Sequence, residues 1–117
     1  MKPIWVYDPI FTRNIYIFYK WKEADFNKYM IKNYDIRFEV SDYEGLCSEI
    51  IYERKKLLII WVDKIENIKA ISTLAHEAVH ASSFVFKNAH QKLDSDNDEL
   101  QAYYVGMIVK AALTGGF

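Results

Sequence analysis

Two histidines and a glutamate near the middle of the chain have the residue types and the spacing to hold a metal ion. His76 and His80 are four residues apart, and Glu77 lies between them in an apolar run, residues 65–86, that favours a helix. Residues four apart on a helix are separated by a rise of about 6 Å and face the same way. Zinc–nitrogen bonds are only about 2.0–2.1 Å long, so two imidazoles that share one ion must come from one face. We expect His76 and His80 to bind zinc and Glu77, on the flank of that face, to reach a water beside the ion.

The alternative is that both histidines are ordinary helix residues and that Glu77 is a surface charge. Small side chains surround the motif and leave room for a metal ion and a neighbouring helix: Ala75, Ala78, Ala81, Ser82 and Ser83.

A catalytic zinc site needs a third protein ligand that leaves one position free for water. The best candidate is Glu99, which opens the last predicted helix 19 residues after His80 and leaves room for one returning loop. The alternative for Glu99 is an ordinary carboxylate at a helix N-terminus, where it interacts with the helix dipole. His90, ten residues after His80, is a further candidate.

A calcium site of the EF-hand type is not expected in the acidic stretch before the last helix. Asp94, Asp96 and Asp98 alternate as such a loop requires, but Glu99 stands where the loop needs a glycine and Val105 where it needs a glutamate.

The sequence as a whole predicts a single domain, residues 1–117, of the α+β class. Strands are predicted at residues 4–7, 14–19, 36–40, 46–52 and 57–62, with a charged hairpin tip at residues 53–56. An amphipathic helix is predicted at residues 21–34. We expect the strands to form a small antiparallel sheet that packs on the histidine helix and on a C-terminal helix carrying Glu99.

The ends of the two later helices are predicted from local signals. Asp63 and Glu66 match a capping box, so the histidine helix should start near Lys64 and end at residues 87–90. A polar loop, residues 92–98, should follow, and the last helix should run from about Asp98 to Leu113.

Composition limits the classes of function. The formal net charge is −1, so no excess of basic charge indicates a nucleic-acid or membrane-surface partner. Cys47 is the single cysteine, which excludes an intramolecular disulfide and a zinc site built from cysteines. No secretory signal and no stretch of about 18 apolar residues is present, so we expect a soluble, cytoplasmic protein. Aromatic residues, 16% of the chain, are expected to fill a small core.

Taken together, the two motifs resemble the plan of the gluzincins, in which one helix carries two histidines and a general base and the next helix a glutamate ligand. The stretches concerned read His76-Glu77-Ala78-Val79-His80 and Asp98-Glu99-Leu100-Gln101-Ala102-Tyr103. The short chain and the strands before the motif are similar to minimal gluzincin-like (HExxH…E) zinc metallopeptidases of phages and mobile elements. The resemblance covers about residues 46–113.

This resemblance implies zinc ligation by His76, His80 and Glu99, with Glu77 as the general base that takes a proton from a zinc-bound water. The metzincin pattern is excluded, because Ser83 and Phe86 stand where it needs a glycine and a histidine.

Peptide hydrolysis also needs a group that stabilises the oxyanion. Tyr103, four residues after Glu99 on the same helical face, is a candidate, and Tyr104 competes with it. The alternative for Tyr103 is a core aromatic residue with its hydroxyl at the rim. A second hydrogen-bond partner for each histidine is expected from one of three residues: Thr73, Ser83 or Asp94.

An extended peptide substrate could pair with an edge strand ahead of the motif, for which residues 57–62 are the candidate. Three consecutive apolar residues there, Ile59, Ile60 and Trp61, indicate burial on both faces and argue against an edge.

The sequence therefore predicts a zinc-dependent peptidase, a hydrolase acting on a peptide or protein. The alternative is a non-catalytic binding or regulatory protein on the same scaffold, stabilised by zinc or free of metal. A DNA-associated function is weaker, because no basic stripe supports it.

Overall fold

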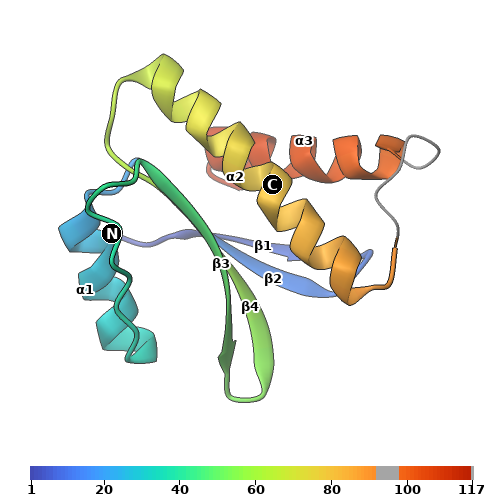
Figure 1. Ribbon diagram of the computed structural model, residues 1–117, viewed down its shortest axis with the longest axis horizontal. Coiled ribbons are helices and arrows are strands. Elements are labelled where there is room, and N and C mark those ends of the chain that lie inside the picture. Colours follow the sequence, from blue (N-terminus) through green and yellow to red (C-terminus); the bar gives the residue numbers. More distant parts are fainter. Residues whose placement is uncertain (92–97, 117) are drawn as a thin grey trace.

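A four-stranded mixed sheet lies at the centre of the fold, in the strand order β1-β2-β4-β3. The computed structural model describes residues 1–91 and 98–116. Along the chain the elements are β1 (Ile4–Asp8), β2 (Arg13–Tyr19), α1 (Glu23–Tyr34), β3 (Gly45–Tyr52), β4 (Lys55–Val62), α2 (Asn67–Asn88) and α3 (Asp98–Thr114) (Figure 1). This arrangement confirms the α+β class.

The expectation of a purely antiparallel sheet is wrong. β1 pairs with β2 and β3 pairs with β4 in antiparallel fashion, but β2 and β4 are parallel neighbours. Parallel strands need a crossover connection, and here α1 lies within it. The crossover also places β4 inside the sheet, so residues 57–62 are not an edge, and β3 is the edge strand on that side.

The helices cover both faces of the sheet and create two apolar cores. α2 and α3 pack on one face, over side chains such as Ile15, Leu58 and Ile60. α1 covers the other face, over Phe18, Ile59 and Trp61 (Figure 1). β4 is therefore buried on both faces, which is the physical reason for its uninterrupted apolar run.

Residues 36–40, predicted to be a strand, have no regular secondary structure. Val40 is buried there, and Ile36 and Phe38 pack against the core beneath α1. The side-chain amide of Asn27 replaces a neighbouring strand: its Nδ2 donates to the Phe38 carbonyl at 2.9 Å, and its Oδ1 accepts from the Phe38 N–H at 2.8 Å. The alternation of apolar residues thus reflects a loop packed on α1.

Two predicted boundaries shift by a few residues. The β3–β4 turn consists of Glu53 and Arg54, both with positive φ (51° and 68°), so residues 55 and 56 belong to β4 rather than to the tip. The capping box is also wrong, since α2 starts at Asn67 and not near Lys64. Glu66 is itself the N-cap, and its carboxylate accepts from the backbone N–H of Lys69. The end of α2 and the predicted α3 are confirmed.

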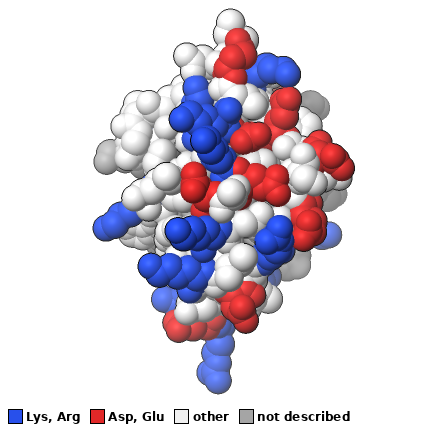
Figure 2. Space-filling view, turned by 90° about the vertical axis from the view of Figure 1, so that its left-hand side faces the viewer, with Lys and Arg blue, Asp and Glu red and all other residues white. Residues whose placement is uncertain are grey.

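Figure 2 shows the face of the molecule on the side of α1, where basic and acidic side chains are interspersed. α1 itself carries Glu23 and Asp25 in its first turn and Lys32 in its last. This mixed surface differs from the basic stripe typical of nucleic-acid binding. Among the described helices, none is long and apolar enough to cross a membrane.

Candidate metal centre

α2 separates its apolar and its polar side chains onto opposite sides. Its buried residues are Ala70, Leu74, Glu77, Ala78, Ala81, Ser82, Val85 and Phe86. With about 100° per residue, His76 and His80 lie roughly 150° from the centre of that buried face. Both histidines are accordingly exposed. The local helical period therefore presents the pair to solvent beside the region where β3 packs on α2.

The two imidazoles converge on one point. His76 Nε2 and His80 Nε2 are 3.2 Å apart, and the ring centroids are separated by 4.8 Å with the planes at 74°. Two ligands at 2.0–2.1 Å from a tetrahedral zinc ion are about 3.3–3.4 Å apart, so the observed separation suits a shared ion. A hydrogen bond between the two neutral rings, one donating and the other accepting, is the other arrangement compatible with this distance.

Glu77 lies beside the pair but on the buried flank of α2. Its side chain is largely covered, with 8% of the residue exposed. One carboxylate oxygen and one nitrogen from each histidine all lie within 4.8 Å of one another. Burial raises the pKa of the Glu77 carboxyl, while His76 and His80 lower it when they are charged. The arrangement places a carboxylate of increased basicity next to two convergent nitrogens.

The edge strand β3 holds Glu77 in place through a close approach at Gly45. A Cβ at position 45 would lie 2.5 Å from Thr73 Cγ2 and 3.0 Å from Glu77 Oε2. Only a glycine lets the strand come this near without displacing those side chains. The strand predicted at residues 46–52 leaves Gly45 out, whereas β3 begins at Gly45. The close approach joins residues 32 positions apart, and no local pattern could have revealed it.

Cys47 lies between Gly45 and Glu49 on the same side of β3. Burial and, to a smaller extent, the nearby carboxylates of Glu77 and Glu49 raise the pKa of its thiol to about 12. The thiol is therefore neutral at ordinary pH and does not resemble a thiolate ligand.

Glu99 is not part of the histidine cluster. Among the described residues, the group of potential metal ligands around the pair consists of His76, Glu77 and His80. Glu99 is exposed in the first turn of α3 and lines, with Val79 of α2, a surface hollow of about 560 Å³. Val79 immediately precedes His80, so Glu99 borders a hollow next to the histidine face. Its role as third ligand stays a prediction.

The two tyrosines proposed for the oxyanion have different surroundings. Tyr103 is 60% exposed, and the helical period turns it roughly 120° away from the middle of the α3 face that lines the hollow with Val79. Tyr104 is fully buried and faces Asp8 and Arg13, and burial followed by the Asp8 charge raises the pKa of its phenol. Tyr104 thus belongs to the core away from the histidines, while the role of Tyr103 stays a prediction.

The other candidates near the motif have local structural roles. The Ser83 hydroxyl donates to the Val79 carbonyl of its own helix at 3.1 Å. Thr73 has its methyl group against Gly45. His90 lies beyond the end of α2 with φ 58°, where its N–H donates to Lys87 O and helps to cap the helix. Asp94 and Asp96, with the rest of the predicted loop before Asp98, lie outside the described residues.

Comparison with known proteins does not place this chain in a family: no family model, no curated protein and no solved structure matches it.

Proposed function

We propose that the chain is a zinc-dependent peptidase of the zincin type, with His76 and His80 as metal ligands and Glu77 as general base. The observation that supports it most is the pair of Nε2 atoms 3.2 Å apart beside a buried carboxylate. This donor set fits zinc, which favours neutral imidazole nitrogens in tetrahedral geometry. Glu99 is the proposed third ligand, reached from α3 across the hollow next to Val79.

The proposed chemistry assigns each side chain a separate task. A zinc ion held by His76 and His80 would supply Lewis acidity and would lower the pKa of a water beside it to around 7. Glu77 accepts the proton of the attacking water and delivers it to the leaving amine. Its partial burial supports this task, because a carboxylate with a raised pKa is a better proton acceptor. Tyr103 is the proposed donor to the oxyanion.

The substrate proposed is an extended peptide that adds to the free edge of β3. β3 is the outer strand of the sheet, and it packs against α2 at Gly45, next to Glu77. A peptide paired with β3 would extend the sheet by main-chain hydrogen bonds and pass close to the general base. β3 therefore replaces residues 57–62 as the proposed docking edge.

The first experiment measures metal content. Purified wild-type protein exposed to zinc and then desalted should contain about one zinc ion per chain, as a single site requires. His80→Ala should lose the ion and Glu77→Gln should keep it. Zinc content in His80→Ala equal to that of wild type would overturn the assignment.

The second experiment measures cleavage of a quenched fluorogenic peptide library. Glu77→Gln should lower the rate by about 10²–10⁴-fold, the usual contribution of a general base. Glu53→Gln, at the exposed β3–β4 turn, is the matched control and should cleave as wild type does. Equal cleavage by Glu77→Gln would remove Glu77 from the mechanism.

A second candidate is a non-catalytic protein that uses the metal to stabilise its fold. The observation that favours it is the position of Glu99, outside the group formed by His76, Glu77 and His80. In that case a chelator should unfold the domain, as it does for structural zinc sites. If the site is catalytic, the protein treated with chelator should lose activity but keep most of its secondary structure.

A further inference from the structure

A second polar site lies at the opposite end of α2, away from the histidines. A hollow of about 510 Å³ opens between the β1–β2 connection, the start of β4 and the last turn of α2. Its lining includes three cationic residues, Arg13, Lys55 and Lys56, together with Asn14 and Asn88.

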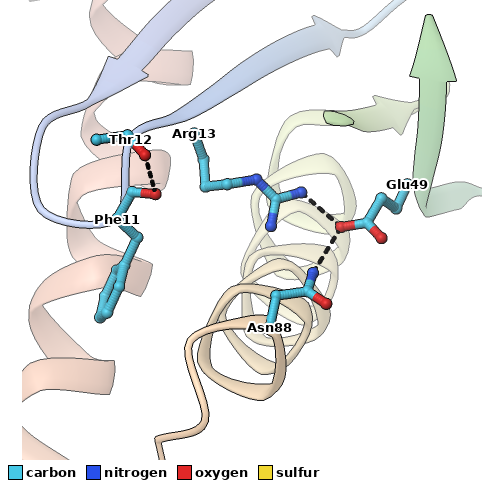
Figure 3. Close-up of polar contacts among 5 residues, drawn as sticks. All are labelled: Phe11, Thr12, Arg13, Glu49 and Asn88. Atoms are coloured by element: carbon cyan, nitrogen blue, oxygen red, sulfur yellow. Dashed lines mark hydrogen bonds and ion pairs between the residues drawn. The ribbon is translucent and has the colours of Figure 1, made fainter. Parts of the chain in front are cut away.

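Arg13 is the buried component of this site. Its side chain is 9% exposed, and its Nη2 contacts Glu49 Oε2 at 2.5 Å. The same carboxylate oxygen accepts from Asn88 Nδ2 at 2.8 Å (Figure 3). Within the described part of the chain, the buried Nε–H of Arg13 has no hydrogen-bond partner. Leaving such a charged donor unsatisfied is unfavourable, which points to a missing acceptor.

The strand register brings a second cation next to Arg13. Asn14 pairs with Leu57 in the parallel β2–β4 ladder, so Arg13 stands beside Lys56 on neighbouring strands. Like charges directly opposite each other on neighbouring strands are destabilising. An anion bound between the two side chains would remove this repulsion.

The nearby carboxylates do not neutralise the site. Glu49 is held by Arg13 and Asn88, as described above. Asp8, which faces Arg13 across the β1–β2 ladder, accepts from the backbone N–H groups of Ile10 and Phe11 at 2.8 and 3.2 Å. The lining residues Arg13, Lys55 and Lys56 carry three positive charges and these two carboxylates carry two negative charges, so the five residues sum to +1.

The end of α2 does not oppose an anion strongly. The carbonyls of Val85, Phe86 and Lys87, which would repel it, accept hydrogen bonds from the backbone N–H groups that follow the helix. Phe11 and Val85 add an apolar wall to the hollow. Phe11 is held in place by aromatic contacts with Phe86 and Tyr104, at centroid distances of 5.5 and 6.1 Å.

We propose that this hollow binds the phosphate group of a small phosphate monoester. Arg13 and Lys56 are its cationic ligands, Lys55 lies at its rim, and the apolar wall packs against the rest of the ligand. A doubly charged oxyanion suits the guanidinium and the two ammonium groups. The size of the hollow lies within the range of small-molecule sites, about 300–1,000 Å³, and exceeds the needs of a bare phosphate.

The experiment titrates inorganic phosphate, phenyl phosphate and acetate into the protein, with binding followed by amide chemical shifts in NMR spectra. His80→Ala serves as the background, because phosphate could also bind a metal ion at the histidines. Both phosphates should bind at one site, phenyl phosphate more tightly, with a dissociation constant of about a millimolar or below. Acetate should bind at least about tenfold more weakly.

Variants decide whether the site is the one described. Lys56→Gln should weaken phenyl phosphate binding by roughly tenfold. Lys28→Gln, an exposed charge on α1 across the sheet, should leave it unchanged. Arg13→Lys should also weaken binding, because the charge remains while the guanidinium N–H groups are lost. The exposed Lys56 keeps the test valid if a change at the buried Arg13 disturbs folding.

Three results would overturn the proposal: no saturable binding of either phosphate, equal binding by Lys56→Gln, or equal affinity for phosphate and acetate. The first would mean that water alone satisfies Arg13 Nε. Phenyl phosphate binding no tighter than inorganic phosphate would overturn the monoester assignment.

Discussion

Replacing Gly45 by alanine tests how closely β3 packs against the candidate general base. The new Cβ would lie 2.5 Å from Thr73 Cγ2, 3.0 Å from Glu77 Oε2 and 3.2 Å from Glu77 Cγ. Contacts this short force side chains or backbone to move, and overpacking of this kind costs about 1–3 kcal/mol. Gly45 is not among the residues with positive φ, so alanine meets no backbone penalty there.

The sign of the effect is informative. Without the close contact, a change from glycine to alanine inside a strand should stabilise the protein by about 0.5–1 kcal/mol. Gly106→Ala in α3 provides that comparison, since a Cβ there meets nothing within 4 Å. We expect Gly106→Ala to raise the free energy of unfolding and Gly45→Ala to lower it.

The measurement is urea unfolding followed by far-UV circular dichroism, supported by thermal melts. A loss of 1–3 kcal/mol should lower the melting temperature by roughly 4–6 °C for each kcal/mol in a domain of this size. Thr73→Ser removes the methyl group closest to the new Cβ, so the Gly45→Ala/Thr73→Ser double variant should recover part of the loss. Gly45→Ala should also impair cleavage more than its stability loss explains, because Glu77 is displaced.

Stability of Gly45→Ala equal to or above that of wild type would refute the close approach of β3 to α2. Failure of Thr73→Ser to recover any stability would place the strain elsewhere.

Three further predictions concern other parts of the molecule. Asn27→Ala should destabilise the protein by about 2–3 kcal/mol, because two partly buried hydrogen bonds to Phe38 are lost. Asn33→Ala, on the exposed side of α1, should change stability by less than about 0.5 kcal/mol in the same urea assay. The Cys47 thiol, whose pKa is raised to about 12, should stay protonated between pH 8 and 10 and react slowly with iodoacetamide in the folded protein. Labelling should be fast only in urea, and rapid labelling of the folded protein would contradict the burial of the thiol. Excess zinc should raise the melting temperature of wild type by mass action and leave His80→Ala unchanged, and an equal rise in both would show binding away from the histidines.

The third metal ligand, for which Glu99 is proposed, needs the most direct test. Glu99 is four residues before Tyr103 on an exposed turn of α3, and it contributes no atom to the described ligand group. Zinc content of Glu99→Gln, measured beside that of His80→Ala, decides whether its carboxylate is a ligand. A value equal to wild type would leave the first turn of α3 without a role at the metal.

Helix periodicity explains why the centre of the candidate site was predictable. His76 and His80 point to the same side because they are four residues apart on one helix, and this relation follows from the backbone geometry of every α-helix. α1 and α3 were predictable for the same reason, because the spacing of their apolar residues and the polar residues at their ends lie within one short segment of the sequence. β3 and the long apolar run of β4 were likewise predicted as strands, but the edge position of β3 was not.

Local sequence patterns were therefore sufficient for the helices and strands, apart from residues 36–40, and for the two imidazoles on one helical face. Three contacts appear only in the folded chain: β4 lies between two partner strands, Asn27 pairs with the backbone of Phe38, and Gly45 lies against Glu77. These contacts join residues far apart in the chain, and several distant partners satisfy the same local pattern equally well. The energy of packing a whole sheet against its helices selects among them, and no short stretch of sequence carries that information.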